Sequence, residues 1–80
     1  MFGKEKQQEL KIALMFFVHQ GYASDVKSVH CINGYPSFRC SWYDDEALDK
    51  LCEEYGVESH TSWNGKENSK VLVWVEPIRN

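Results

Sequence analysis

Apolar and polar residues alternate along the chain with two periodicities, one typical of helices and one typical of strands. Residues 4–20 contain neither Gly nor Pro, their apolar positions have helical spacing, and Gly21 follows as a stop. Residues 45–55 have the same character, with Asp44 as a suitable N-cap, acidic residues in the first turn and Gly56 after the end. We therefore predict two helices, over residues 4–20 and 45–55.

Runs of β-branched and aromatic residues predict two hairpins. The predicted strands are residues 26–32, 37–43, 57–63 and 69–76. The first pair flanks Asn33-Gly34-Tyr35-Pro36, and the second flanks residues 64–68, which also begin with Asn-Gly. An Asn-Gly step between such runs is a strong hairpin signal. Pro77 is expected to end the last strand.

The element order α-β-β-α-β-β predicts an α+β fold. Residues 71–75 are apolar throughout, as in a central strand, and Phe38, Cys40 and Trp42 share one face of their strand. If the second strands of the two hairpins pair, they form a four-stranded antiparallel sheet with two helices on one face. This arrangement is a circular permutation of the ferredoxin-like fold. In the alternative, the hairpins stay apart and dimerisation completes the sheet.

The length of the chain indicates a single domain, residues 1–80, because a chain of this size buries one small core. Its two halves, approximately residues 4–43 and 44–76, resemble each other. Asn33-Gly34 and Asn64-Gly65 occupy equivalent places, 31 residues apart. The match indicates either an internal duplication or two hairpins that use the same turn for physical reasons.

Composition and segment lengths exclude several classes of protein. The chain is 42% hydrophobic and 26% charged, as in globular proteins and unlike disordered ones. The longest apolar run, residues 12–18, is far shorter than the roughly 20 residues of a membrane-spanning helix. No secretion signal is recognisable. We therefore expect a cytoplasmic protein without a membrane partner.

Three cysteines, Cys31, Cys40 and Cys52, are the candidate metal ligands and nucleophiles. In a reducing compartment they are free thiols, and we expect all three to face the core as small hydrophobic groups. No Cys-x2-Cys pair exists, and His30 points to the sheet face opposite Cys31, so we expect no metal and no cofactor. With no nucleophile elbow or oxyanion motif either, we expect no catalytic residues and no enzyme activity.

The first predicted helix is apolar on two sides. One stripe consists of Leu10, Ala13, Leu14, Phe17 and Val18, and the opposite one of Ile12, Met15, Phe16 and His19. A helix that lies on a sheet needs only one such stripe. The second stripe is either covered by a loop, by Phe2 or by the other helix, or it forms an interface with a second copy or another protein.

Charge is concentrated in residues 44–58, which contain seven acidic residues and one Lys. The net charge of −3 therefore divides into −6 in this segment and +3 in the rest of the chain. Asp45, Asp49 and Glu53 follow one another at helical spacing. They form either an ordinary solvated helix face or a docking surface for a basic protein, with imitation of nucleic-acid phosphates as a further possibility.

The sheet face away from the helices is another candidate surface. Its expected contacts are His30, Arg39 and Tyr43 from the first hairpin, with Trp63 from the second. Sheets that bind RNA present aromatic side chains flanked by Lys and Arg. Because the sequence displays no Lys/Arg cluster and the net charge is negative, an RNA-binding module is the alternative reading and nucleic acid is not the expected partner.

One resemblance to a known family concerns the order of features. A helix, Gly21-Tyr22, a hairpin, the segment EALDKLCEEYGVE and a Trp follow one another over residues 10–63. This layout is similar to the ribonuclease E inhibitor B family, which implies a small regulator of an enzyme. The family's Tyr-Asp-Gly-Trp signature is replaced by His60-Thr61-Ser62-Trp63, so no functional residue is carried over.

The sequence thus favours a non-catalytic cytosolic protein that acts by stoichiometric binding and inhibits or modulates a larger protein. It would do so as a homodimer or in a hetero-complex. Small acidic α+β chains of this kind resemble the accessory proteins with which phages and mobile elements inhibit host enzymes or defence systems. The expected partner-binding residues are Ile12, Met15, Phe16, His19, Asp45, Asp49 and Glu53.

Overall fold

Two helices, a four-stranded antiparallel sheet and a separate two-stranded sheet make up the computed structural model, which describes residues 2–78. The fold is α+β, as the order of hydrophobic patterns predicts. The elements are α1 (Lys4–His19), β1 (Ala23–Ser24), β2 (His30–Ile32), β3 (Tyr35–Cys40), β4 (Trp42–Tyr43), α2 (Asp45–Tyr55), β5 (Val57–Ser62) and β6 (Val71–Pro77).

Both helices form where their end signals place them. The carboxylate of Asp44 accepts a hydrogen bond of 3.0 Å from the backbone N–H of Ala47 and so caps the first turn of α2. Gly56 ends α2 in the left-handed conformation, with φ of 66°. The helix α1 ends at His19, one residue before the predicted end, and Gly21 follows with φ of 88°.

The main sheet has the strand order β2-β3-β6-β5. The second strands of the two hairpins pair in its centre, where Phe38 lies opposite Val73. This pairing confirms the predicted sheet, and the alternative with separated hairpins is wrong. Asn33 and Gly34, with φ of 53° and 83°, form the tight turn of the first hairpin, so Tyr35 and Pro36 belong to β3 and not to the turn.

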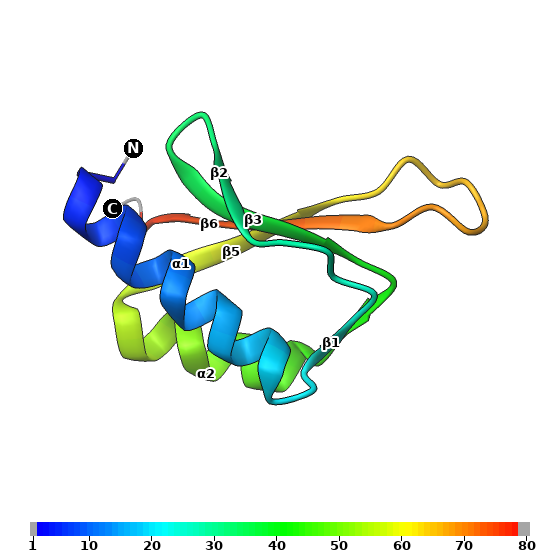
Figure 1. The fold of residues 1–80 in the computed structure, drawn as a ribbon, viewed down its shortest axis with the longest axis horizontal. Helices are drawn as coiled ribbons and strands as arrows, with labels where there is room; N and C mark the ends of the chain where they lie inside the picture. The colour runs from blue at the N-terminus through cyan, green and yellow to red at the C-terminus, as the bar shows by residue number, and fades with distance from the viewer. Residues whose placement is uncertain (1, 79–80) are drawn as a thin grey trace.

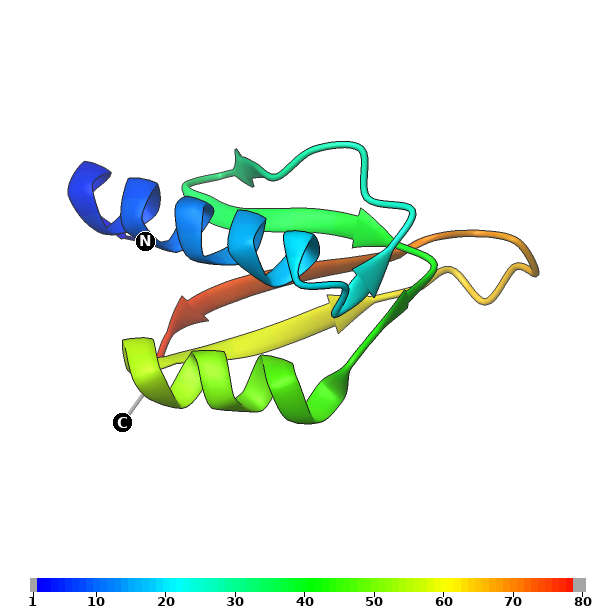
Figure 2. The ribbon, with the colours of Figure 1, turned by 60° about the horizontal axis from the view of Figure 1, so that its bottom comes forward.

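Both helices lie on the same side of this sheet, α1 across β3 and α2 along β5 (Figures 1 and 2). The core fills the space between the two layers. Its fully enclosed side chains include Leu10 and Leu14 of α1, Leu48 of α2 and Phe38 at the centre of the sheet. Within residues 2–78, neither helix has the length and the apolar content needed to cross a membrane.

The first predicted hairpin is shorter and more irregular than its sequence indicates. Residues 26–29 are not in a strand, and the strand predicted over 37–43 breaks at Ser41. The N–H of Ser41 donates to the carbonyl of Ser24 (3.0 Å), and β4 leaves the main sheet to pair with β1. Trp42, predicted to face the core, is consequently 54% exposed.

The cysteines divide into two classes. Cys40 and Cys52 are buried, as predicted, whereas Cys31 is exposed. The expectation for Cys31 is wrong because β2 is a three-residue edge strand with a neighbour on one side only. Its position in the strand turns the thiol toward the helix layer, but no side chain covers it there.

The fold predicts different losses of stability for Phe-to-Ala substitutions at two positions. Phe38→Ala, at a side chain with no exposed surface, should lower the free energy of unfolding by about 3–5 kcal/mol, because it opens a cavity in the core. Phe16→Ala, at a side chain that is 64% exposed, should change it by about 0.5 kcal/mol or less. Urea unfolding followed by circular dichroism measures both; equal losses would contradict this assignment of the core.

Candidate functional site

The outer stripe of α1 lies in solvent. Ile12, Met15 and Phe16 are 46%, 44% and 64% exposed, and His19 is also exposed. Phe2, a candidate cover, is itself buried in the core, where its ring meets the edge of Tyr35. The cover is only partial: α2 borders Ile12 and Phe16, and residues 26–29 border Met15. We call Ile12, Met15 and Phe16 the apolar stripe.

A groove of about 410 Å³ adjoins the apolar stripe and runs between the two helices. Ile12 and Phe16 line it from α1, and Leu51 and Tyr55 line it from α2. Lys6 links the helices: its Nζ donates to the carbonyl of Tyr55 (3.2 Å) and lies 5.7 Å from the centre of that residue's ring. The groove therefore has mostly apolar walls that are held by a contact between its two helices.

The acidic stripe, Asp45, Asp49 and Glu53, is exposed on a different side of α2. Asp49 and Glu53 border a hollow toward β5, whereas Leu51 and Tyr55 border the groove toward α1. At 100° per residue, the acidic stripe points away from α1. The structure thus places the two predicted binding surfaces apart, so one small partner does not contact both.

The open face of the main sheet carries only part of the predicted set. His30 and Arg39 lie on it, because they occupy positions of the same face as Ser37. Trp63 follows the end of β5 and is 57% exposed outside the sheet. The prediction for Tyr43 is wrong, since β4 has left the main sheet.

The hydroxyl of Tyr43 instead lies beside Asp45 and Thr61. Burial raises the pKa of this hydroxyl, and the carboxylate of Asp45 raises it further. Tyr43 therefore helps to hold the start of α2 against the end of β5. Its role is structural, and it is not available to a ligand on the open face.

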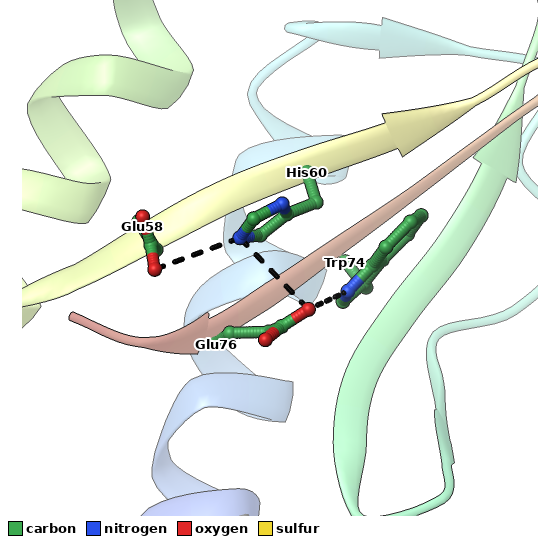
Figure 3. Close-up of polar contacts among 4 residues, drawn as sticks. All are labelled: Glu58, His60, Trp74 and Glu76. Carbon is green, nitrogen blue, oxygen red and sulfur yellow. Dashed lines mark hydrogen bonds and ion pairs between the residues drawn. The ribbon is translucent and has the colours of Figure 1, made fainter. Parts of the chain in front are cut away.

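A polar and aromatic cluster on the open face was not predicted from the sequence. The rings of His60 and Trp74 stack, with centroids 5.6 Å apart and planes 17° apart (Figure 3). The indole N–H of Trp74 donates to Oε2 of Glu76 at 2.7 Å. His60 Nε2 lies 3.7 Å from Glu58 Oε1 and 3.8 Å from Glu76 Oε2. Two strands thus hold two flat rings in fixed orientation.

This cluster follows from strand register. Glu58 and His60 alternate along β5, Trp74 and Glu76 alternate along β6, and the register places His60 opposite Trp74 and Glu58 opposite Glu76. The alternation of polar residues is visible in the sequence, but the register is not. His60 Nε2 is buried and has no hydrogen-bond partner within residues 2–78. Within the described residues, stacking therefore holds the His60 ring in place without a hydrogen bond at its Nε2 atom.

Comparison with known proteins gives no relative: no protein-family model, no curated protein and no solved structure matches the chain. Within the described part of the chain, no three His, Cys, Asp or Glu side chains are grouped so that they could hold a metal ion. Function is therefore argued from the surfaces themselves.

The exposure of the cysteines predicts one reactive thiol. Burial raises the pKa of the Cys40 and Cys52 thiols, which lowers their thiolate fraction, and both are shielded from reagents. With Ellman's reagent under native conditions, we expect one fast equivalent from Cys31 and two that react only as the protein opens. Cys31→Ser should remove the fast equivalent; a fast phase that survives this substitution would contradict the burial of the other two thiols.

Proposed function

We propose that this protein is a non-catalytic binding protein that inhibits or modulates a larger protein by stoichiometric contact through α1. The proposal includes a cytoplasmic location and a role like that of the accessory proteins of phages and mobile elements. A regulator of an enzyme, as in the ribonuclease-inhibitor layout, is one form of the same activity. The observation that carries the proposal is the solvent exposure of the apolar stripe.

The apolar stripe has the chemistry of a protein interface. Three neighbouring large apolar side chains on one helix face are each about half exposed, and burial of the exposed part of each against a partner would contribute about 1 kcal/mol. Met and Phe are favoured at such interfaces because they bury a large area and Met adapts its shape. The adjoining groove gives a partner's apolar side chain a place to insert between Phe16 and Leu51.

The acidic stripe adds an electrostatic preference for the partner. Its three carboxylates belong to the segment that carries −6, and they are exposed. Such a field attracts basic proteins and increases the rate of association at low ionic strength more than it increases affinity. We infer a large partner that presents apolar side chains to α1 and carries a net positive charge.

We also infer that the fold is a circular permutation of the ferredoxin-like fold with an internal pseudo-repeat. The strand order β2-β3-β6-β5 is the order that this permutation produces. Each half contributes a helix and a hairpin, α1-β2-β3 and α2-β5-β6, and the halves meet at the central pair. The small β1–β4 sheet has no equivalent in the second half and is an addition to this plan.

The binding proposal predicts that a charge in the apolar stripe abolishes association. Phe16→Asp should convert a self-associated wild type into a monomer in light scattering at several concentrations. If the wild type is already monomeric, the substitution should lower capture of a cellular partner at least about tenfold, because a buried unpaired carboxylate opposes the contact. Asn68→Asp, which adds the same charge at an exposed position in the loop between β5 and β6, is the matched control and should leave association unchanged.

Circular dichroism establishes that both variants remain folded. The proposal is wrong if folded Phe16→Asp has the same mass in solution as the wild type and captures the same protein at the same level. A loss that Asn68→Asp shares equally would also contradict it, because the effect would then belong to net charge and not to the apolar stripe.

The acidic stripe generates a separate prediction about rates. The triple variant Asp45→Lys, Asp49→Lys, Glu53→Lys should slow association with the captured partner about tenfold or more at low salt. The difference should shrink toward none as salt rises, because the Debye length falls to about 3 Å at 1 M. Stopped-flow association rates at several salt concentrations test this; rates equal to those of the wild type at low salt would exclude electrostatic steering by α2.

A further inference from the structure

A cluster of basic side chains gathers at one end of the open sheet face. Lys27, His30, Arg39 and Lys70, together with Ser28, line a hollow of about 380 Å³. The Nζ of Lys70 donates to the backbone carbonyl of Asp25 at 2.6 Å. The side chains of Lys27 and Arg39 have no ion-pair partner within residues 2–78. The hollow therefore carries positive charge that the described part of the chain does not neutralise.

This cluster is a product of topology and is absent from the linear sequence. Lys27 and His30 precede or begin β2, Arg39 lies near the end of β3, and Lys70 directly precedes β6. The strand order brings these three segments together at one end of the sheet. Three basic residues from outside residues 44–58, Lys27, Arg39 and Lys70, thus come together at one hollow.

The basic hollow continues into an aromatic one on the same face. A second hollow of about 320 Å³ is lined by Tyr35, Ser37, Leu72 and Trp74, among others. Ser37 of this second hollow is the register partner of His30, and Leu72 is the partner of Arg39. Directly paired side chains on one sheet face lie about 4.5–5.5 Å apart at Cβ, so the two hollows adjoin each other.

The far end of the same face is acidic. Glu58 and Glu76 form the next row beyond Trp74 and His60 (Figure 3). An anionic group is therefore repelled at this end and attracted at the basic hollow. The face has a direction, with cations at one end, a stacked aromatic pair in the middle and carboxylates at the other end.

We propose that the open face binds single-stranded nucleic acid, with consecutive backbone phosphates at the Lys27, Arg39 and Lys70 side chains of the basic hollow and an adjacent base against Trp74. Lys and Arg provide the charge for a phosphate, and an aromatic ring held in place accepts any base by stacking. Trp74 is suited to stacking because its orientation is set by His60 and by the hydrogen bond to Glu76. The site meets the apolar stripe only where Lys27 and Ser28 lie beside Met15, and Trp74, Arg39 and Lys70 belong to the sheet side. It therefore extends the proposed function and does not depend on it.

Fluorescence anisotropy with a labelled oligouridylate of about 12 nucleotides tests the proposal. Three phosphate contacts predict that binding weakens about 20-fold between about 50 mM and about 200 mM salt, because condensed counterions are released. The variant Lys27→Ala/Arg39→Ala should bind more weakly, and its salt dependence should fall to about threefold. The matched control, Lys4→Ala/Lys50→Ala, removes two exposed charges from the helix layer and should behave as the wild type.

Two variants of Trp74 test the base contact. Trp74→Leu should weaken binding at least about fivefold at every salt concentration, and Trp74→Phe, which keeps a ring, should recover most of the loss. Circular dichroism confirms that both are folded. If Trp74→Leu binds like the wild type while the basic variants do not, the site holds phosphate without a base and the proposed mode is wrong.

Competing ligands show whether the site binds a nucleic-acid strand, a free nucleotide or inorganic phosphate. Adenosine monophosphate and inorganic phosphate compete only weakly if several nucleotides of a strand are needed, which supports the proposal. If adenosine monophosphate competes as strongly as an equal concentration of oligonucleotide binding sites, the site binds free nucleotides and the proposal is wrong. The proposal is also wrong if the oligonucleotide does not bind at about 50 mM salt. Phe16→Asp should leave oligonucleotide binding unchanged, so failure of either proposal is seen separately.

Discussion

The pairing of β3 with β6 is the constraint on which the rest of the structure depends. Phe38 and Val73, opposite each other and without exposed surface, join two hairpins that are otherwise local units. An antiparallel sheet can have one face against a core and its other face in water. The β3–β6 pairing therefore also determines which surfaces of the molecule are exposed. Both helices cover one side of the sheet, and no helix covers the other side in the described part of the chain (Figure 1).

Two binding surfaces of different chemistry follow from this division. On the helix side, each helix needs one apolar stripe for the core, so the second stripe of α1 is left in solvent. On the other side, strand register alone arranges the side chains, and it sorts them by charge along the sheet. The apolar stripe and the basic hollow come together only at Lys27 and Ser28, which also line a hollow beside Met15.

Features with local causes were predicted from the sequence, and features with distant causes were not. The capped helix after Asp44 and the Asn33-Gly34 turn depend on a few adjacent residues. The strand breaks at Ser41 because Ser41 bonds to the distant Ser24. The sequence does not reveal this contact, so the positions predicted for Trp42 and Tyr43 were wrong. The exposed stripe of α1 could be recognised from helical spacing. The basic hollow could not, because Lys27 and Lys70 meet only through the strand order.

The separation of charge has a consequence for how the molecule approaches its surroundings. Residues 44–55 contain six acidic residues and one Lys on the helix side, whereas Lys27, Arg39 and Lys70 line the hollow of the open face. The chain therefore has a permanent dipole moment that crosses its two layers. In the field of a charged surface the molecule rotates before contact, so it presents α2 to cations and the open face to polyanions.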